Sequence, residues 1–224
     1  MNSPVQTTPG SSRAMSIEAM GVTGIVFALL AFIAVEMLRG LPGWSADHAT
    51  VEQWFGMAGH RNQLTAVVLI MVVASIALLW FIGTIRRRIG RAEDQLFATV
   101  FLGSGLILIT VLLTAVAAFA VPATLAQQVS AKAAADAYPV GHGLGMILMT
   151  IVAPRIAAVF MLSLANLARI TGAFPKWLTI LSTVAALFML VAVTVSIHIA
   201  WILPTWCLVV SVVIMWRRKR LAAP

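Results

Sequence analysis

The sequence is short of charge. Lysine, arginine, aspartate and glutamate make up 10% of its 224 residues, whereas soluble domains usually contain about 25%. Hydrophobic residues account for 61% of the chain. This balance excludes an ordinary soluble globular domain, because several apolar runs approach or exceed the roughly 20 residues that are needed to cross a bilayer.

Cysteine and the common catalytic motifs are also scarce. The single cysteine, Cys207, lies in an apolar run, which excludes an intramolecular disulfide and a cysteine-based metal cluster. The chain has no H-E-x-x-H motif, phosphate-binding loop or haem attachment motif. The GHGLG segment at 141–145 lacks the glycine spacing and the preceding strand of a dinucleotide-binding loop. No cofactor is therefore evident, and any cofactor is unknown at this point.

The Gly103-Ser104-Gly105 segment does not support an intramembrane serine protease. The usual G-x-S-G spacing is broken, because Leu102 stands at the first glycine position. Ser104 is expected in the inner half of its span and His198 at the outer face, too far apart for a base to activate the hydroxyl. The two glycines are better explained by close packing between helices.

What the sequence does contain is a series of long apolar segments. Residues 177–216 form one run of 40 residues in which His198 is the only ionisable side chain of consequence. One helix of that length would measure about 60 Å, so the run must fold back near 196–200. The fold class is therefore predicted as all-α, a polytopic six-helix membrane bundle over residues 16–216. Its spans are expected at about 20–38, 64–85, 96–121, 141–168, 177–195 and 201–216.

The positive charges flank these spans. The formal net charge is +8, and no separate basic domain exists, so we expect no nucleic-acid partner. A six-span arrangement places 11 of the 15 lysines and arginines on the side of both termini, which the positive-inside rule makes cytoplasmic. Residues 1–15 are expected to form a disordered cytoplasmic tail, and 217–224 a basic cytoplasmic tail.

The first loop, 39–63, contains a short amphipathic pattern. Asp47 is the predicted N-cap and Gly59 the stop signal. We expect this helix to lie on the membrane surface, with Trp54 and Phe55 in the interface. Its apolar residues are spaced at i, i+3, i+4 and i+7: Val51, Trp54, Phe55 and Ala58. Another loop, with room for a turn or two of helix, is expected at 123–140, after Pro122 ends the third span.

Arg155 is the least expected residue, because it lies in the middle of a predicted span. A charge at mid-membrane costs roughly 2.5–3.5 kcal/mol on insertion scales. Pro154 cannot donate to the carbonyl of Thr150, which leaves that carbonyl free to solvate the guanidinium. Asn166 follows eleven residues later, on nearly the same helix face. Arg155 and Asn166 thus form a candidate ligand site for an anion or lipid head group; the alternative is an arginine that fixes helix packing.

Glu36 is the only acidic residue within a predicted span, which makes it a candidate partner of Arg155. At 1.5 Å per residue, however, Glu36 is expected about 3 Å from the outer surface and Arg155 about 20 Å. The other partner within reach is Arg39, three residues away.

All four histidines are expected on the outer side of the membrane. His142 and His198 are the better candidates for metal ligands, because both are fixed at span ends. Imidazole and carboxylate ligands suit Zn²⁺, Cu²⁺ or iron. No two histidines have the i, i+4 spacing of a helix-borne metal pair, so the alternative is that polar residues gather where the water is.

Three segments carry a resemblance. They are VEQWF at 51–55, with LWFIG at 79–83, and TGAFPKWL at 171–178. Over most of residues 20–216 the chain resembles a broad group of uncharacterised bacterial six-span integral membrane proteins. The resemblance implies the six-helix architecture and the bacterial inner membrane, and it assigns no functional residues.

Three functions remain open on the sequence. The first is a non-enzymatic accessory protein that binds lipid, a second copy of itself or another membrane protein. The second is a small transporter with Arg155 in its pathway. The third is a membrane-embedded metal- or haem-dependent enzyme that uses the outer histidines and acids. No catalytic residue is predicted, and the short loops favour the first function.

Overall fold

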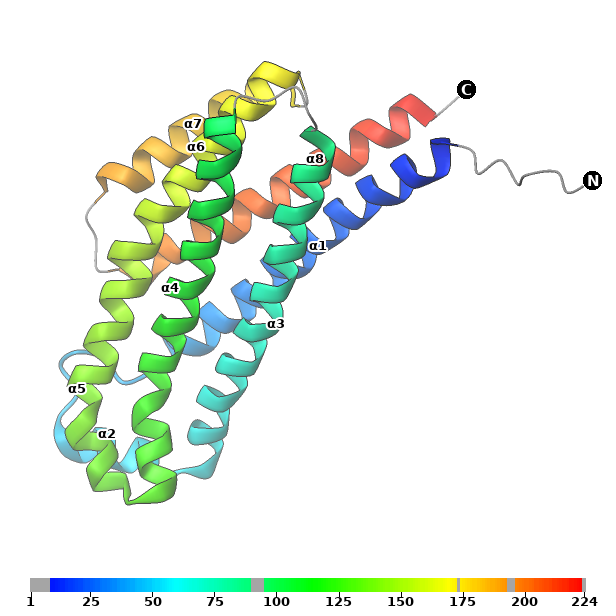
Figure 1. The fold of residues 1–224 in the computed structure, drawn as a ribbon. Helices are drawn as coiled ribbons and strands as arrows, with labels where there is room; N and C mark the ends of the chain where they lie inside the picture. Colours follow the sequence, from blue (N-terminus) through cyan, green and yellow to red (C-terminus); the bar gives the residue numbers. More distant parts are fainter. Residues whose placement is uncertain (1–8, 90–94, 173, 193–195, 223–224) are drawn as a thin grey trace, which may run out of the picture.

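The computed structural model describes residues 9–89, 95–172, 174–192 and 196–222, with side chains placed for 21–86, 96–170, 172, 174–192 and 196–216. Every regular element within these residues is a helix (Figure 1). The elements are α1 (Pro9–Arg39), α2 (His48–Gly56), α3 (Ala58–Ile89), α4 (Gln95–Gln128), α5 (Ala131–Ile147), the π-helical turn η1 (Leu148–Val152), α6 (Ala153–Thr171), α7 (Lys176–Val191), the 3₁₀ turn η2 (Ile197–Trp201) and α8 (Ile202–Ala222).

Five helical segments in the described part of the chain are long and apolar enough to cross a membrane, so the chain is a multi-pass membrane protein. They are Gly21–Arg39, Ala58–Arg86, Leu96–Gln128, Ala131–Ile170 and Ile197–Trp216. The sixth apolar helix, α7, has only 16 residues. Its length of about 24 Å is less than the roughly 30 Å of a hydrocarbon core.

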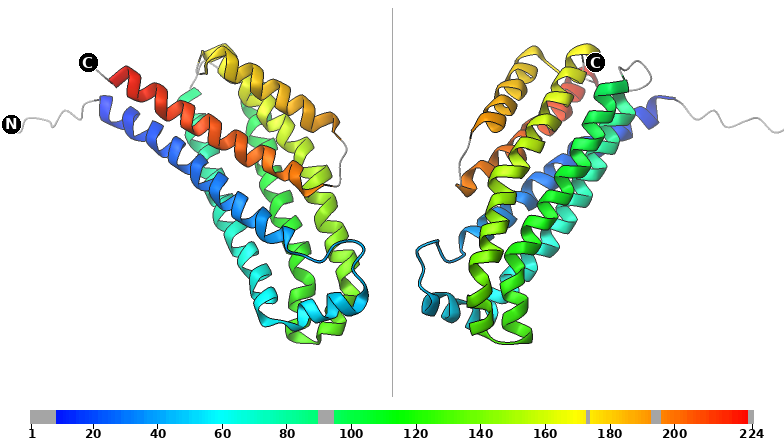
Figure 2. Two further views of the ribbon diagram at one scale, coloured as in Figure 1. Left: turned by 180° about the vertical axis from the view of Figure 1, so that it is seen from behind. Right: turned by 60° about the vertical axis from the view of Figure 1, so that its left-hand side comes forward.

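The helices pack as a bundle whose two ends differ. The described ends of α1 and α8 lie at the same end of the molecule, and these two helices run side by side (Figure 2). Helix α4 packs against α3, α5 and α6, whereas α7 packs mainly along α6. At the opposite end, α2 covers α5 below the loop that follows α1 (Figure 1).

The predicted loop at 123–140 is wrong. Helix α4 continues past Pro122 to Gln128, and α5 begins at Ala131 with Ser130 as its N-cap. The alanine-rich sequence favours helix, and only the Ala118 carbonyl loses its donor at Pro122. A Cβ on Gly141 would lie 2.8 Å from that carbonyl oxygen, so glycine allows α5 to cover it.

Helix α2 forms as predicted but packs differently. The Asp47 side chain accepts a hydrogen bond from the Thr50 backbone N–H at 2.9 Å, and hydrogen bonds from Thr50 lower the pKa of Asp47. The helix ends at Gly56, before the predicted stop at Gly59. Phe55 is fully buried against Tyr138 of α5. The apolar face of α2 therefore packs on protein, and the prediction that Phe55 lies in the membrane interface is wrong.

Helices extend into both predicted tails. Helix α1 begins at Pro9, so the disordered tail predicted over 1–15 is wrong for 9–15, and residues 1–8 lie outside the described chain. Helix α8 continues to Ala222 through most of the basic segment predicted as a tail. The fold-back after α7 occurs where it was predicted, with η2 at Ile197–Trp201.

Glycines allow close packing between α4 and its neighbours. A Cβ on Gly145 would lie 2.8 Å from the Phe119 ring of α4, and one on Gly105 would lie 2.6 Å from Ile82 of α3. Gly103 has no atom within 4 Å of its Cβ position. Of the two glycines predicted to permit close approach, only Gly105 does so.

Alanine substitutions at two glycines should differ in their effect on stability, because Gly141 lies in the α4–α5 contact and no atom lies near the Cβ position of Gly103. Gly141→Ala should lower the free energy of unfolding in detergent by about 1–3 kcal/mol, because the new methyl group clashes with the Ala118 carbonyl. Gly103→Ala should leave it unchanged or raise it by up to about 1 kcal/mol, since alanine favours helix. Thermal unfolding of the two purified variants compares them, and equal melting temperatures would contradict the packing described.

Candidate functional site

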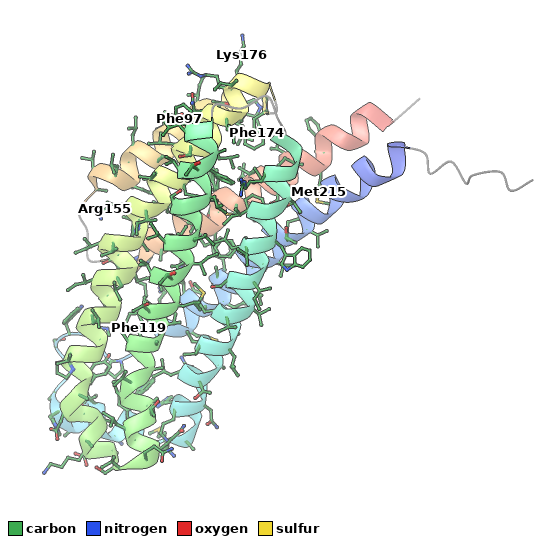
Figure 3. All side chains as sticks on the ribbon, viewed as in Figure 1. Phe97, Phe119, Arg155, Phe174, Lys176 and Met215 are labelled. Atoms are coloured by element: carbon green, nitrogen blue, oxygen red, sulfur yellow. The ribbon has the colours of Figure 1, made fainter. Side chains whose placement is uncertain are left out.

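Arg155 lies where three backbone segments meet. It is on the first turn of α6, directly after the π-helical turn η1 and Pro154. Its Nη1 donates to the Ile151 carbonyl at 2.9 Å and to the Thr150 carbonyl at 3.4 Å, and its Nη2 donates to the Ala192 carbonyl at 2.8 Å. Figure 3 places Arg155 beside the end of α7, halfway along the rod formed by α5, η1 and α6. The predicted contact with the Thr150 carbonyl is confirmed, and Ile151 provides the shorter bond.

The bond from Arg155 to Ala192 stabilises the C-terminal end of the short helix α7. Ala192 is the C-cap of that helix, where the last carbonyls have no helical donor and the helix dipole favours a positive charge. Irregular backbone at membrane depth needs partners from the protein, because lipid offers none. A second side chain also holds α7: Trp206 of α8 donates its indole N–H to the Ser182 hydroxyl at 2.8 Å.

The structure does not bring the other two predicted ligand residues to Arg155. Glu36 pairs with Arg39, with 2.9 Å between Oε2 and Nη1, which is the alternative weighed on the sequence. Asn166 accepts from Arg169 Nη2 at 2.9 Å. Among the described side chains, no carboxylate pairs with Arg155, and its partners are backbone carbonyls.

Asn166 lies instead in a groove of ≈ 550 Å³ between α4, α6 and α7, which we call the α4–α6–α7 groove. Its lining contains both apolar and polar residues. The apolar residues are Leu96, Phe97, Val100, Val159, Leu162 and Ala165. The polar residues are Ser163, Asn166, Arg169, Thr179 and Thr183. Figure 3 shows Phe97 close to the same end of the bundle as Lys176, where α7 begins.

The polar lining follows helical spacing on both helices. Ser163, Asn166 and Arg169 recur every three residues on α6, and Thr179 and Thr183 are four apart on α7, so each set shares one face. The groove was not predicted from the sequence, although the hydroxyl groups of Ser163, Thr179 and Thr183 inside apolar segments were a signal. The sequence alone does not show that these faces of α6 and α7 line the same groove.

The histidines lie in separate places. His142 is buried among aromatic rings, stacked on Tyr138 at 5.0 Å and edge-on to Trp44 at 4.7 Å between ring centroids. His198 is exposed; its Nδ1 lies 2.8 Å from the Ser196 hydroxyl, and its ring contacts Trp201. The residues that contact the His142 ring differ from those that contact His198. The metal site at these two histidines therefore remains a prediction.

The other two histidines hold α2 in place. His48 Nε2 lies 2.8 Å from Asp136 Oδ1 of α5, and His60 is stacked on Trp54 at 4.3 Å. Across the side chains that the structure describes, no group of three or more histidine, cysteine, aspartate or glutamate residues is placed to hold a metal ion.

A small cavity of ≈ 30 Å³ lies between the helices beside Pro154. Its lining is apolar and includes Met71, Met149 and Met189. Arg155 lines neither this cavity nor the α4–α6–α7 groove. The transporter hypothesis required a water-accessible path to Arg155, and neither hollow provides one.

No family model matches the chain, and no curated protein or solved structure matches it either. The site is therefore interpreted from its own geometry.

The contacts of Arg155 predict a structural effect of its removal. Arg155→Leu should destabilise the protein by about 1–3 kcal/mol, because the Ala192 and Ile151 carbonyls lose their donors. Hydrogen exchange should also accelerate in peptides that cover the last turn of α7. Glu36→Gln is the control, since an exposed ion pair contributes about 0–1 kcal/mol. An Arg155→Leu protein as stable and as protected as the control would contradict this role.

Proposed function

We propose that this protein is a non-enzymatic membrane protein that holds a single amphiphilic lipid in the α4–α6–α7 groove. The observation that carries the proposal is the mixed lining of that groove, which combines aliphatic and aromatic side chains with Arg169, Asn166 and hydroxyl groups. Its ≈ 550 Å³ falls within the roughly 300–1,000 Å³ of small-molecule sites.

The position of the groove supports a lipid over a water-soluble ligand. Its walls belong to three apolar helices, of which α4 and α6 lie within membrane-capable segments. Val159 lines the groove and is 38% exposed, so the hollow opens sideways from the bundle. A lipid can enter from the bilayer and place its tail on the apolar wall without crossing water.

The other two hypotheses have less support. The donors of Arg155 are engaged by backbone carbonyls, which favours a packing role over a place in a transport pathway. The metal-dependent enzyme needs ligands that converge, and His142 and His198 contact different residues. Neither function is supported by a hollow that its residues line.

We further propose six crossings in the bacterial inner membrane, with both termini cytoplasmic. Most lysines and arginines fall at the segments that join or flank the helices on the side of the termini, in accord with the positive-inside rule. The Arg39 guanidinium lies 5.5 Å from the Trp201 ring centroid. This contact supports a turn between α7 and α8 that reaches the outer end of α1.

Thiol labelling tests this topology. In a Cys207→Ala background, His198→Cys should react with a membrane-impermeant maleimide added outside intact cells, and Lys176→Cys should react only after the cells are opened. His198 and Lys176 are both exposed, so each thiol can reach the reagent. Labelling of Lys176→Cys from outside, or protection of His198→Cys there, would contradict six crossings with cytoplasmic termini.

Blocking the groove tests the lipid-binding function. Val159→Trp should lower the amount of lipid that remains bound after purification at least ten-fold, because the indole fills the groove. Val184→Trp is the matched control: Val184 is 58% exposed on α7 and does not line the groove. Native mass spectrometry of both proteins measures bound lipid. Equal lipid retention by the two variants, or none in the unmodified protein, would contradict the proposal.

A further inference from the structure

We infer that the ligand of the α4–α6–α7 groove is a lysophospholipid: a single-chain lipid with an anionic phosphate and a free hydroxyl between the phosphate and the chain. This inference rests on the proposed function, since it names the chemistry of the lipid that the groove would hold. It follows from which hydrogen-bonding groups the groove offers, and at what depth.

The donors and the one positive charge of the lining, Arg169, lie at the end of the groove where α6 ends. Arg169 uses one N–H on Asn166 Oδ1 at 2.9 Å, and a guanidinium has five N–H groups. Because the Asn166 oxygen is taken, its amide presents two N–H groups. Lys176 is exposed one turn before Thr179 on α7 and does not line the groove. Phosphate oxygens fit this end, because they accept several charge-assisted hydrogen bonds.

The deeper hydroxyls have the opposite character. Ser163 donates to the Val159 carbonyl at 2.8 Å, and Thr183 donates to the Thr179 carbonyl at 2.9 Å. Each hydroxyl has one proton and two acceptor lone pairs, so what remains for a ligand is acceptor capacity. The group that complements it is a donor, such as an alcohol. The ester oxygens of a diacyl phospholipid are acceptors only and do not meet this need.

The spacing along the helices places the donor groups near the ends of α6 and α7 that face Lys176, and the acceptor hydroxyls farther along both helices. At 1.5 Å per residue, Asn166 lies about 4.5 Å along α6 from Arg169, and Thr179 lies about 4.5 Å along α7 from Lys176. Ser163 and Thr183 lie about 9 Å and about 10.5 Å from the same two residues. The alcohol of a lysophospholipid lies a few bonds below its phosphate, on the way to the chain. The apolar residues Val100, Val159 and Leu162 then meet the chain.

The test separates charge from the hydroxyl with three single-chain probes. They are oleoyl lysophosphatidic acid, its 2-O-methyl ether, which lacks the hydroxyl proton, and oleoyl lysophosphatidylcholine, which is zwitterionic. Native mass spectrometry of the full chain in detergent gives the dissociation constant of each. Lysophosphatidic acid should bind about 5-fold more tightly than the methyl ether, as expected for one hydrogen bond, and about 10-fold more tightly than lysophosphatidylcholine.

Variants should remove each preference separately. Ser163→Ala with Thr183→Val should abolish the preference over the methyl ether and keep the preference for the anion. Arg169→Gln should abolish the preference for the anion and keep that for the hydroxyl. Thr110→Val with Thr114→Val is the matched control, because these threonines also donate to their own helix, at 3.1 and 2.8 Å, and lie outside the groove. This control should bind all three probes as the unmodified protein does.

The outcomes distinguish this inference from the proposed function. Equal binding of all three probes, together with lipid loss in Val159→Trp, would overturn the lysophospholipid assignment and leave the groove as a lipid site. Tighter binding of dioleoyl phosphatidic acid than of the lysolipid would also overturn it, since a diacyl lipid lacks the alcohol. Absence of probe binding, with unchanged lipid retention in Val159→Trp, would overturn both.

Discussion

The hydrogen bonds from Arg155 to three backbone carbonyls are the interaction on which the packing of α7 against η1 and α6 depends. A proline, a π-helical turn and the early end of α7 all leave carbonyls without helical donors, and a bilayer supplies no water to satisfy them. One guanidinium donates to two carbonyls of η1 and to the C-cap carbonyl of α7. The dipoles of these backbone carbonyls in turn solvate the guanidinium charge.

Helix α7 provides one wall of the groove. A helix that packs mainly along one neighbour, α6, leaves room beside α4 for a hollow of ≈ 550 Å³. Arg155 and Trp206 fix α7 at its end and its middle through bonds of 2.8 Å each, and these anchors set the position of Thr179 and Thr183 in the wall. A packing arginine and a binding groove are therefore parts of one arrangement, although Arg155 does not line the groove.

The sequence was sufficient to predict features that depend on composition and local chemistry. It was not sufficient for features that depend on which helices pack together. Hydropathy was sufficient for the apolar segments and for the fold-back near His198, and the Asp47 cap followed from local chemistry. Pro122 was taken as a helix end, because its effect depends on whether a neighbouring residue such as Gly141 can cover the freed carbonyl. Phe55 was predicted to lie in the membrane interface, since periodicity identifies an apolar face but not what covers it. Asn166 was assigned to Arg155 from helical phase alone, whereas its partner is Arg169, one turn away.

The most direct test of the account is an electron cryo-microscopy map of the protein in nanodiscs that contain lysophosphatidic acid. The account predicts density for a phosphate beside Arg169 and Asn166, and a single chain that runs along Val100 and Val159, with α7 held by Arg155. A groove closed by movement of α7 onto α4, or an empty groove with lipid bound elsewhere on the bundle, would contradict it.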